Sequence, residues 1–209
     1  KFSKKKLEAL CIGALIHDIG KSLIPKRLME KETQFTESEI EILNHHPRLG
    51  YKYLSSTYNI NSLSKLIVLQ HHERPDGLGF PDRLTDENII DLSKIVSIAD
   101  AYDNLSTDLP GKRAMFPSDV LEYLMSNAGT MFDYNLISVF CRIIIPFPKG
   151  TVVRLSTEEI ARVEETIPNF PLRPILRIIS GPRESRIGNK ISLLEELSIV
   201  ITEIVYDVE

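Results

Sequence analysis

The 209-residue sequence contains no tryptophan and only two cysteines. Cys11 and Cys141 lie far apart in apolar stretches, a pattern that excludes a disulfide framework and a cysteine-rich metal knuckle. We expect both to be buried free thiols in a reducing compartment, and therefore a cytoplasmic protein. No apolar run approaches the roughly 18 residues of a membrane-spanning helix, so no membrane segment is expected in this chain.

The sequence also lacks an excess of positive charge. Lys and Arg total 25 against 29 Asp and Glu, which gives a net charge of −4. This balance argues against DNA or RNA as a partner, although a local basic site for a small anion remains compatible with it. With 43% hydrophobic residues, the chain can bury one large core, or one large and one small core.

Helical periodicity dominates the first two thirds of the chain. Thr36 followed by Glu39 is a capping-box signal for the start of one helix, and Pro117 favours the start of another. The predicted helices cover about residues 3–17, 36–44, 48–56, 62–72, 91–105, 117–129 and 133–145.

The composition changes after residue 146. Short segments rich in Val and Ile, separated by Pro and Gly, are typical of strands. They cover residues 151–155, 159–166, 175–179 and 199–205. The sequence therefore predicts a mainly α protein, with a helical domain at residues 1–146 and a small β-rich domain at residues 147–209.

The histidines are few and clustered, since all five lie between residues 17 and 72. Pro75 and Gly77 should end the helix that carries the adjacent pair at 71 and 72. We interpret His45 as an ordinary histidine without a ligand role. The other four combine with two aspartates into a candidate metal-binding set: His17, Asp18, His46, His71, His72 and Asp100. Nitrogen and carboxylate ligands suit iron, manganese or zinc, and the set is large enough for more than one ion.

Metal ligands of this kind indicate phosphodiester hydrolysis. A carboxylate beside a histidine, as Asp18 is, can bridge two ions, and paired ions activate a water and clamp both oxygens of a phosphoryl displacement. Lys21 follows three residues later, so one helical turn would place its ammonium where it offsets charge on a phosphate oxygen. Asp18 and Lys21 are therefore the predicted catalytic residues.

These residues also resemble a known family, the HD-GYP subgroup of the HD metal-dependent phosphohydrolases. The similar motifs run through about residues 7–145, and segments near residues 150–156 and 172–174 resemble the small β extension of that family. The motifs are His17-Asp18-Ile19-Gly20-Lys21, His46-Pro47 with Gly50, His71-His72-Glu73-Arg74 with Asp76-Gly77-Leu78-Gly79-Phe80-Pro81, Ala99-Asp100-Ala101-Tyr102-Asp103, and Gly129 with Phe132-Asp133.

The resemblance implies a bacterial phosphodiesterase that hydrolyses a cyclic dinucleotide, above all cyclic di-GMP, with a metal-bridging hydroxide. It implies two or three divalent ions, iron or manganese more than zinc, and substrate contacts from Lys21, Lys112 and Phe80. One ion would be held by His17, Asp18 and Asp100, and the other by Asp18, His46, His71 and His72.

Three departures from the family pattern stand out. The family supplies a further histidine ligand from a helix well upstream of the His-Asp pair. The resemblance therefore predicts either a chain truncated at its N-terminus or an incomplete first metal site, with an upstream sensory domain or a cyclase as a partner. Phe80 replaces the usual tyrosine and loses its hydroxyl. Leu109-Pro110-Gly111-Lys112 replaces Arg-Pro-Tyr-Arg, so only Lys112 offers a charge to phosphate.

Two alternatives to a cyclic di-GMP phosphodiesterase stay open. One is a catalytically weak or inactive module that senses a nucleotide or binds another protein, which the departures favour. The other is an HD phosphohydrolase that acts on a different nucleotide. Turnover of substrate in molar excess over protein would distinguish a phosphodiesterase from the inactive module. A panel of nucleotides would distinguish cyclic di-GMP from a different substrate.

Overall fold

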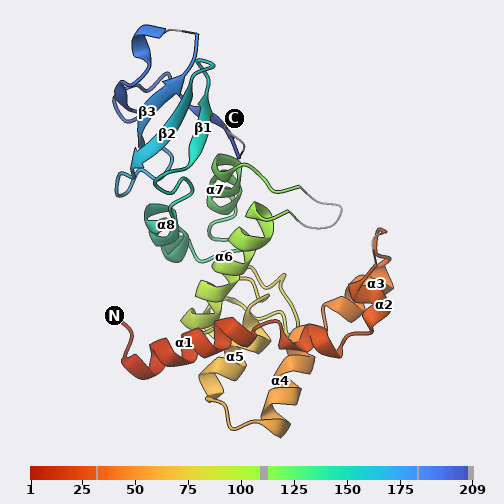
Figure 1. Ribbon diagram of the computed structural model, residues 1–209. Helices are drawn as coiled ribbons and strands as arrows, with labels where there is room; N and C mark the ends of the chain where they lie inside the picture. The colour runs from red at the N-terminus through yellow and green to blue at the C-terminus, as the bar shows by residue number, and fades with distance from the viewer. Residues whose placement is uncertain (32, 109–112, 183, 207–209) are drawn as a thin grey trace. The chain divides into compact units, whose positions relative to one another are not determined.

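The computed structural model describes residues 1–31, 33–108, 113–182 and 184–206 (Figure 1). It divides into two compact units, one made of residues 1–115 and 122–137 and the other of residues 116–121 and 138–209. We call them the helical unit and the β unit. The predicted domain boundary at residue 146 stays a prediction.

The helical elements begin and end close to the predicted positions, and Thr36 and Glu39 form the expected capping box. The helices are α1 (Lys4–Ile16), η1 (Ile19–Leu23), α2 (Lys26–Met29), α3 (Glu37–Leu43), α4 (His46–Thr57), α5 (Ser62–Gln70), η2 (Asp86–Asn88), α6 (Asp91–Ser106), α7 (Pro117–Ser126) and α8 (Tyr134–Ile143). The four-residue α2 was not predicted, because one turn is too short to show a period. Helix α4 begins at His46 rather than at Arg48, since Pro47 is accommodated in the first turn.

Helix α5 lies at the centre of the helical unit, in contact with α1, α4 and α6 (Figure 1). Ile67 and Val68 of α5 are fully buried. A Cβ added to Gly13 of α1 would lie 2.5 Å from Cδ1 of Ile67, so this glycine lets the two helices approach closely. The close contact fixes the position of α1, and with it the residues that follow its last turn.

Helix α1 packs Leu10 and Ala14 against the core but leaves other apolar residues exposed. Leu15 is 85% exposed, and Cys11 is exposed as well, so the expectation of a buried thiol there was wrong. The fully buried residues of this helix are the small Ala9 and Gly13. Cys141 is half-buried. In the described part of the chain, no helix has both the length and the apolar character needed to cross a membrane.

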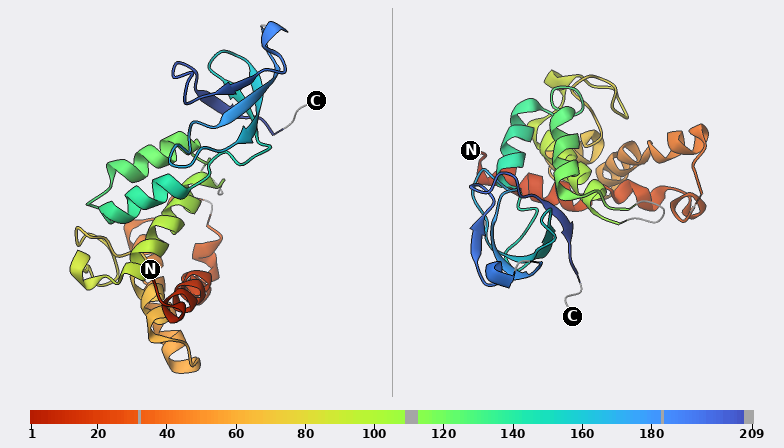
Figure 2. Two further views of the ribbon diagram at one scale, coloured as in Figure 1. Left: turned by 90° about the vertical axis from the view of Figure 1, so that its left-hand side faces the viewer. Right: turned by 90° about the horizontal axis from the view of Figure 1, so that it is seen from above.

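The β unit contains one antiparallel sheet with the strand order β4-β3-β2-β1-β5, which is strongly curved in both views of Figure 2. Its strands are β1 (Val152–Leu155), β2 (Ile160–Glu165), β3 (Ile175–Ser180), β4 (Lys190–Ser192) and β5 (Ile201–Ile204). Alternate residues face an apolar core that includes Phe147, and Val153, Leu155 and Leu176 in that core are fully buried. The small β-rich region is confirmed. The three-residue β4 was not predicted, since so short a segment shows no alternation.

Candidate metal centre

The ends of helices position most of the predicted ligands. The placements are His17 at the C-cap of α1, Asp18 just before η1, His46 at the first residue of α4, His71 at the C-cap of α5, His72 directly after it, and Asp100 within α6. As predicted, the turn after α5 releases the backbone from the helix, and both neighbouring imidazoles lie in the same cluster.

Gly20 allows η1 to lie directly against the start of α4. A Cβ at this position would lie 1.9 Å from the carbonyl oxygen of His46 and 2.8 Å from the amide nitrogen of Gly50. Any side chain would therefore push η1 away from α4. The two glycines of the HD-type motifs thus allow Asp18, in the turn before η1, to reach His46.

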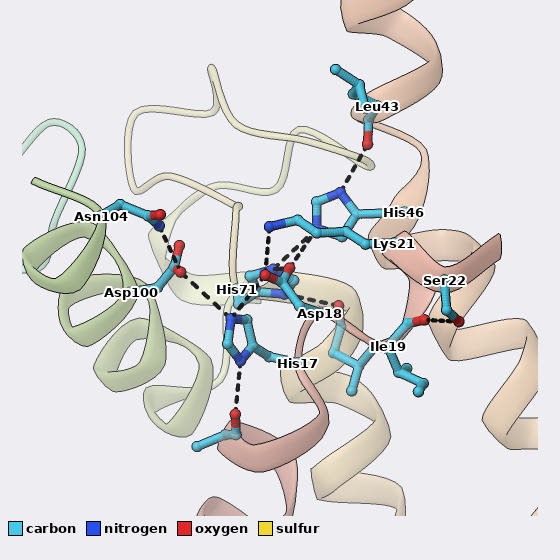
Figure 3. Close-up of polar contacts among 12 residues, drawn as sticks. His17, Asp18, Ile19, Lys21, Ser22, Leu43, His46, His71, Asp100 and Asn104 are labelled. Carbon is cyan, nitrogen blue, oxygen red and sulfur yellow. Dashed lines mark hydrogen bonds and ion pairs between the residues drawn. The ribbon is translucent and has the colours of Figure 1, made fainter. Parts of the chain in front are cut away.

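Three of the predicted imidazoles, those of His17, His46 and His71, surround the carboxylate of Asp18, and Asp100 lies beside His17 (Figure 3). Oδ1 of Asp18 lies 3.2 Å from Nε2 of His46 and 3.6 Å from Nε2 of His71. On its other side, Oδ2 lies 3.4 Å from Nε2 of His17, which in turn lies 3.5 Å from Oδ1 of Asp100. The donor atoms form two groups, each within 4.8 Å, that share Asp18: one contains Asp18, His46, His71 and His72, and the other contains His17, Asp18 and Asp100.

Three of the imidazoles are held in one orientation by backbone carbonyls. Nδ1 of His17 lies 2.7 Å from the carbonyl of Ala14. The same contact joins His46 to Leu43 at 2.8 Å and His71 to Val68 at 2.9 Å. A carbonyl oxygen only accepts, so each Nδ1 is assigned as the donor, and each ring in its neutral form presents the lone pair of Nε2 to the site. This second interaction is the one that orients histidines at metal centres.

The arrangement leaves polar atoms that only a cation satisfies well. Nε2 of His46 lies 3.3 Å from Nε2 of His71, so two lone pairs face each other. Nε2 of His17 and Oδ1 of Asp18 are buried and make no hydrogen bond of good geometry within the described residues. Buried polar atoms are rarely left without a partner. The residues therefore fit divalent ions at this place.

The pKa shifts agree with a site that favours positive charge. Asp100, and then Asp18, raises the pKa of His17 to about 10, against the opposing effect of burial. Burial alone would raise the pKa of Asp18, but contacts with the three imidazoles and Lys21 hold it well below its usual range. The position between the two carboxylates thus attracts a proton, or a metal ion in its place.

His71 and His72, in the other donor group, stay neutral. Burial is the largest cause that lowers the pKa of His71 and of His72, and it lowers the pKa of His72 to about 2. Neutral imidazoles and an ionised carboxylate are the protonation states in which these side chains bind metal.

The other predicted residues lie at the edge of this cluster. Nζ of Lys21 is 2.5 Å from Oδ2 of Asp18, one turn away as predicted. The ring of Phe80 stacks on His72 with centroids 4.6 Å apart. His45 is exposed and lies outside both groups. Lys112 lies outside the described residues.

Glu73 is a residue that the sequence analysis left without a role. It is 2% exposed, and its two carboxylate oxygens accept hydrogen bonds from the backbone amides of Asp82 at 2.6 Å and Leu84 at 2.9 Å. The amide of Phe80 donates to the carbonyl of His72 at 3.1 Å. These bonds tie the loop back onto the histidine pair and hold Phe80 against His72. The sequence signal that could have indicated this role is the position of Glu73, which directly follows the histidine pair and precedes the glycine-rich loop.

Comparison with known proteins identifies the same two regions. A model described as an HD domain matches residues 1–136, and a model of a KOW domain associated with HD domains matches residues 152–208. Among solved structures, the HD-GYP-type protein Bd1817 of Bdellovibrio bacteriovorus is similar with a TM-score of 0.53 and 25% identity. That similarity covers 65% of this chain and 43% of Bd1817.

Two curated relatives carry names that describe their activity. The cyclic di-GMP phosphodiesterase response regulator RpfG of Xanthomonas campestris pv. campestris is 36% identical over 67% of this chain and 37% of its own length. The cyclic di-GMP phosphodiesterase PdeB of Borreliella burgdorferi is 34% identical over 79% of this chain and 44% of its own length. The chain thus spans less than half of either relative. From the matched models, the motifs and these relatives, the chain belongs to the HD domain family and is of the HD-GYP type.

Proposed function

We propose that this chain is a metal-dependent phosphodiesterase for cyclic dinucleotides, with cyclic di-GMP as its preferred substrate. The observation that carries the proposal is the convergence of three oriented Nε2 atoms and two carboxylates on one buried place. The two curated relatives are named for hydrolysis of cyclic di-GMP.

The two donor groups would each hold one ion, and Asp18 would be shared between them. Imidazole and carboxylate ligands suit iron, manganese and zinc alike, so the preference for iron or manganese rests on the resemblance to the HD-GYP family. Bound ions would supply a nucleophilic water at neutral pH and would draw negative charge from the phosphate.

The protein's own side chains would orient the substrate beside this centre. Lys21 carries an ammonium at the edge of the site, where it can offset charge that develops on a phosphate oxygen. Phe80 offers an apolar ring next to the site, and Glu73 keeps that ring in place through the loop. Lys112 stays a predicted phosphate contact.

A test is hydrolysis of cyclic di-GMP by protein loaded in turn with Fe²⁺, Mn²⁺ or Zn²⁺, with products separated by chromatography. We expect turnover in molar excess over protein and its loss on chelation. Lys21→Ala should reduce kcat while metal content is kept. Equal turnover by Lys21→Ala and the wild-type chain would contradict the role of Lys21, and no turnover with any ion would contradict the proposed activity.

A binding module without turnover is the second candidate. It is favoured by Phe80, which stacks on His72 but has no hydroxyl to offer a ligand. Such a module would bind cyclic di-GMP in a fixed ratio to protein and return it unchanged, which the same chromatographic assay would detect.

A further inference from the structure

A cavity of about 470 Å³ opens beside the candidate metal centre in the helical unit. We call it the α3 cavity, because α3 supplies much of its wall. Phe80 lines the cavity and also stacks on His72, so one aromatic ring separates the cavity from the predicted ligands. Its volume lies within the range of pockets for small molecules. The polar or aromatic residues that line it and enter the argument are Glu37, Glu41, Asn44, Arg48, Phe80 and Arg83.

One side of the α3 cavity presents carboxylates. Glu37 and Glu41 are four residues apart on α3, which places them on the same face of that helix. Both side chains line the cavity. Within the described part of the chain, neither carboxylate takes part in an ion pair or a side-chain hydrogen bond. The cavity therefore offers free hydrogen-bond acceptors on this side.

Guanidinium groups also line the cavity. Arg48 contacts Asp82 and keeps further N–H donors, because a guanidinium carries five. Arg83 makes no ion pair or hydrogen bond among the described residues, and its backbone has a φ of 55°. A non-glycine residue rarely adopts this conformation, and such strain is often kept where a side chain must point at a ligand.

A flat group with neighbouring donors on one edge and neighbouring acceptors on another would satisfy this set. Guanine has N1–H and the N2 amino group on one edge, which suit a carboxylate, and O6 and N7 on another, which accept from a guanidinium fork. Its faces can stack on an aromatic ring such as Phe80. Adenine carries an unprotonated N1, so a carboxylate there would face a lone pair instead of a donor.

We propose that the α3 cavity binds one guanine base of the substrate, with Glu37 or Glu41 accepting from its N1–H edge and Arg83 donating to O6 and N7. This inference rests on the proposed function and adds the feature that selects the base. Because Phe80 both lines the cavity and stacks on His72, a base seated there would lie next to the predicted metal ligands.

The test compares cyclic di-GMP with cyclic di-AMP in two assays on the metal-loaded chain. One assay gives the ratio of kcat/KM values, and the other gives the ratio of dissociation constants for the phosphorothioate analogues, which resist hydrolysis. In the double variant Glu37→Gln/Glu41→Gln, we expect the preference for guanine to fall about tenfold in both assays, with metal content unchanged. Arg83→Asn should act in the same direction, because asparagine tolerates a positive φ while removing the guanidinium.

Glu8→Gln is the matched control, because Glu8 is an exposed carboxylate of α1 that does not line the cavity. It should leave both ratios unchanged. A wild-type chain that binds the two nucleotides equally, or variants that keep its full preference, would overturn the inference and leave the proposed function standing. A wild-type chain that binds and hydrolyses neither nucleotide would contradict the proposed function and this inference with it.

Discussion

The helical unit and the β unit bury very different side chains. Among its described residues, the helical unit encloses seven that are polar or charged: His46, Ser64, Gln70, His71, Glu73, Ser93 and Lys94. In the part of the β unit that the structure describes, Glu159 is the one buried polar residue, and the core is otherwise apolar. Burial of polar groups opposes folding unless each finds a partner. The helical unit is thus organised around chemistry and the β unit around packing, and substitutions in the two should have separable effects.

The largest effect is expected at the residue that both donor groups share. Asp18→Asn removes the charge that the oriented imidazoles face, while the shape of the side chain is kept. We expect loss of bound metal and a fall in hydrolysis of about 100-fold or more. Elemental analysis and turnover on the same sample would measure this, and normal metal content in the variant would contradict the shared role of Asp18.

Leu176→Ala in the β unit should have the opposite pattern of effects, with a loss of stability and no loss of metal. Leu176 is fully buried in the apolar core, so the substitution should lower the free energy of unfolding by about 2–5 kcal/mol. Denaturant unfolding would measure the loss. Metal content of the folded protein should not change, and a parallel loss of metal would show that the two units are not separable.

Two buried glutamates offer a smaller, paired test. Glu73 accepts from two backbone amides, so Glu73→Gln would leave one amide facing an NH₂ group and should cost about 1–3 kcal/mol. In the β unit, Oε1 of Glu159 has no hydrogen-bond partner among the described residues, while its Oε2 accepts from Thr157 at 2.7 Å and lies 3.4 Å from Nη1 of Arg186. Glu159→Gln can keep the bond from Thr157 and loses only the ion pair with Arg186, so its cost should be about 1 kcal/mol, at the lower end of the range for Glu73→Gln.

Unfolding of the two variants in denaturant provides the comparison. Glu73→Gln should also raise KM more than Glu159→Gln, because the loop of Glu73 carries Phe80. An equal cost for both substitutions would show that the amide bonds of Glu73 add nothing to an ordinary buried carboxylate.

Much of the fold could be predicted from local chemistry. The capping box at Thr36 and the breakers after His72 each act within a few residues, so their signals survive in sequence alone. The exposed side chain of Leu15 could not be predicted, because its burial depends on how closely Gly13 allows α1 to approach α5. The short β4 lacked any periodic signal.

The candidate site divides in the same way. The residue types and order of the six predicted ligands pointed to metal, and the structure brings all six together. Their common orientation could not be predicted, because it depends on carbonyl groups such as that of Leu43, which carry no sequence signal. The α3 cavity could not be predicted either, because Glu41 and Arg83 line one cavity only when α3 packs beside the loop after α5.

The most direct test of the account uses two neighbouring histidines. His46 is buried with its Nε2 aimed at Asp18, whereas His45 is exposed and outside both donor groups. Elemental analysis of protein purified without oxygen should find about two ions per chain in the wild type and in His45→Ala. His46→Ala should lose about one of them. Equal metal content in the two variants would contradict the proposed centre.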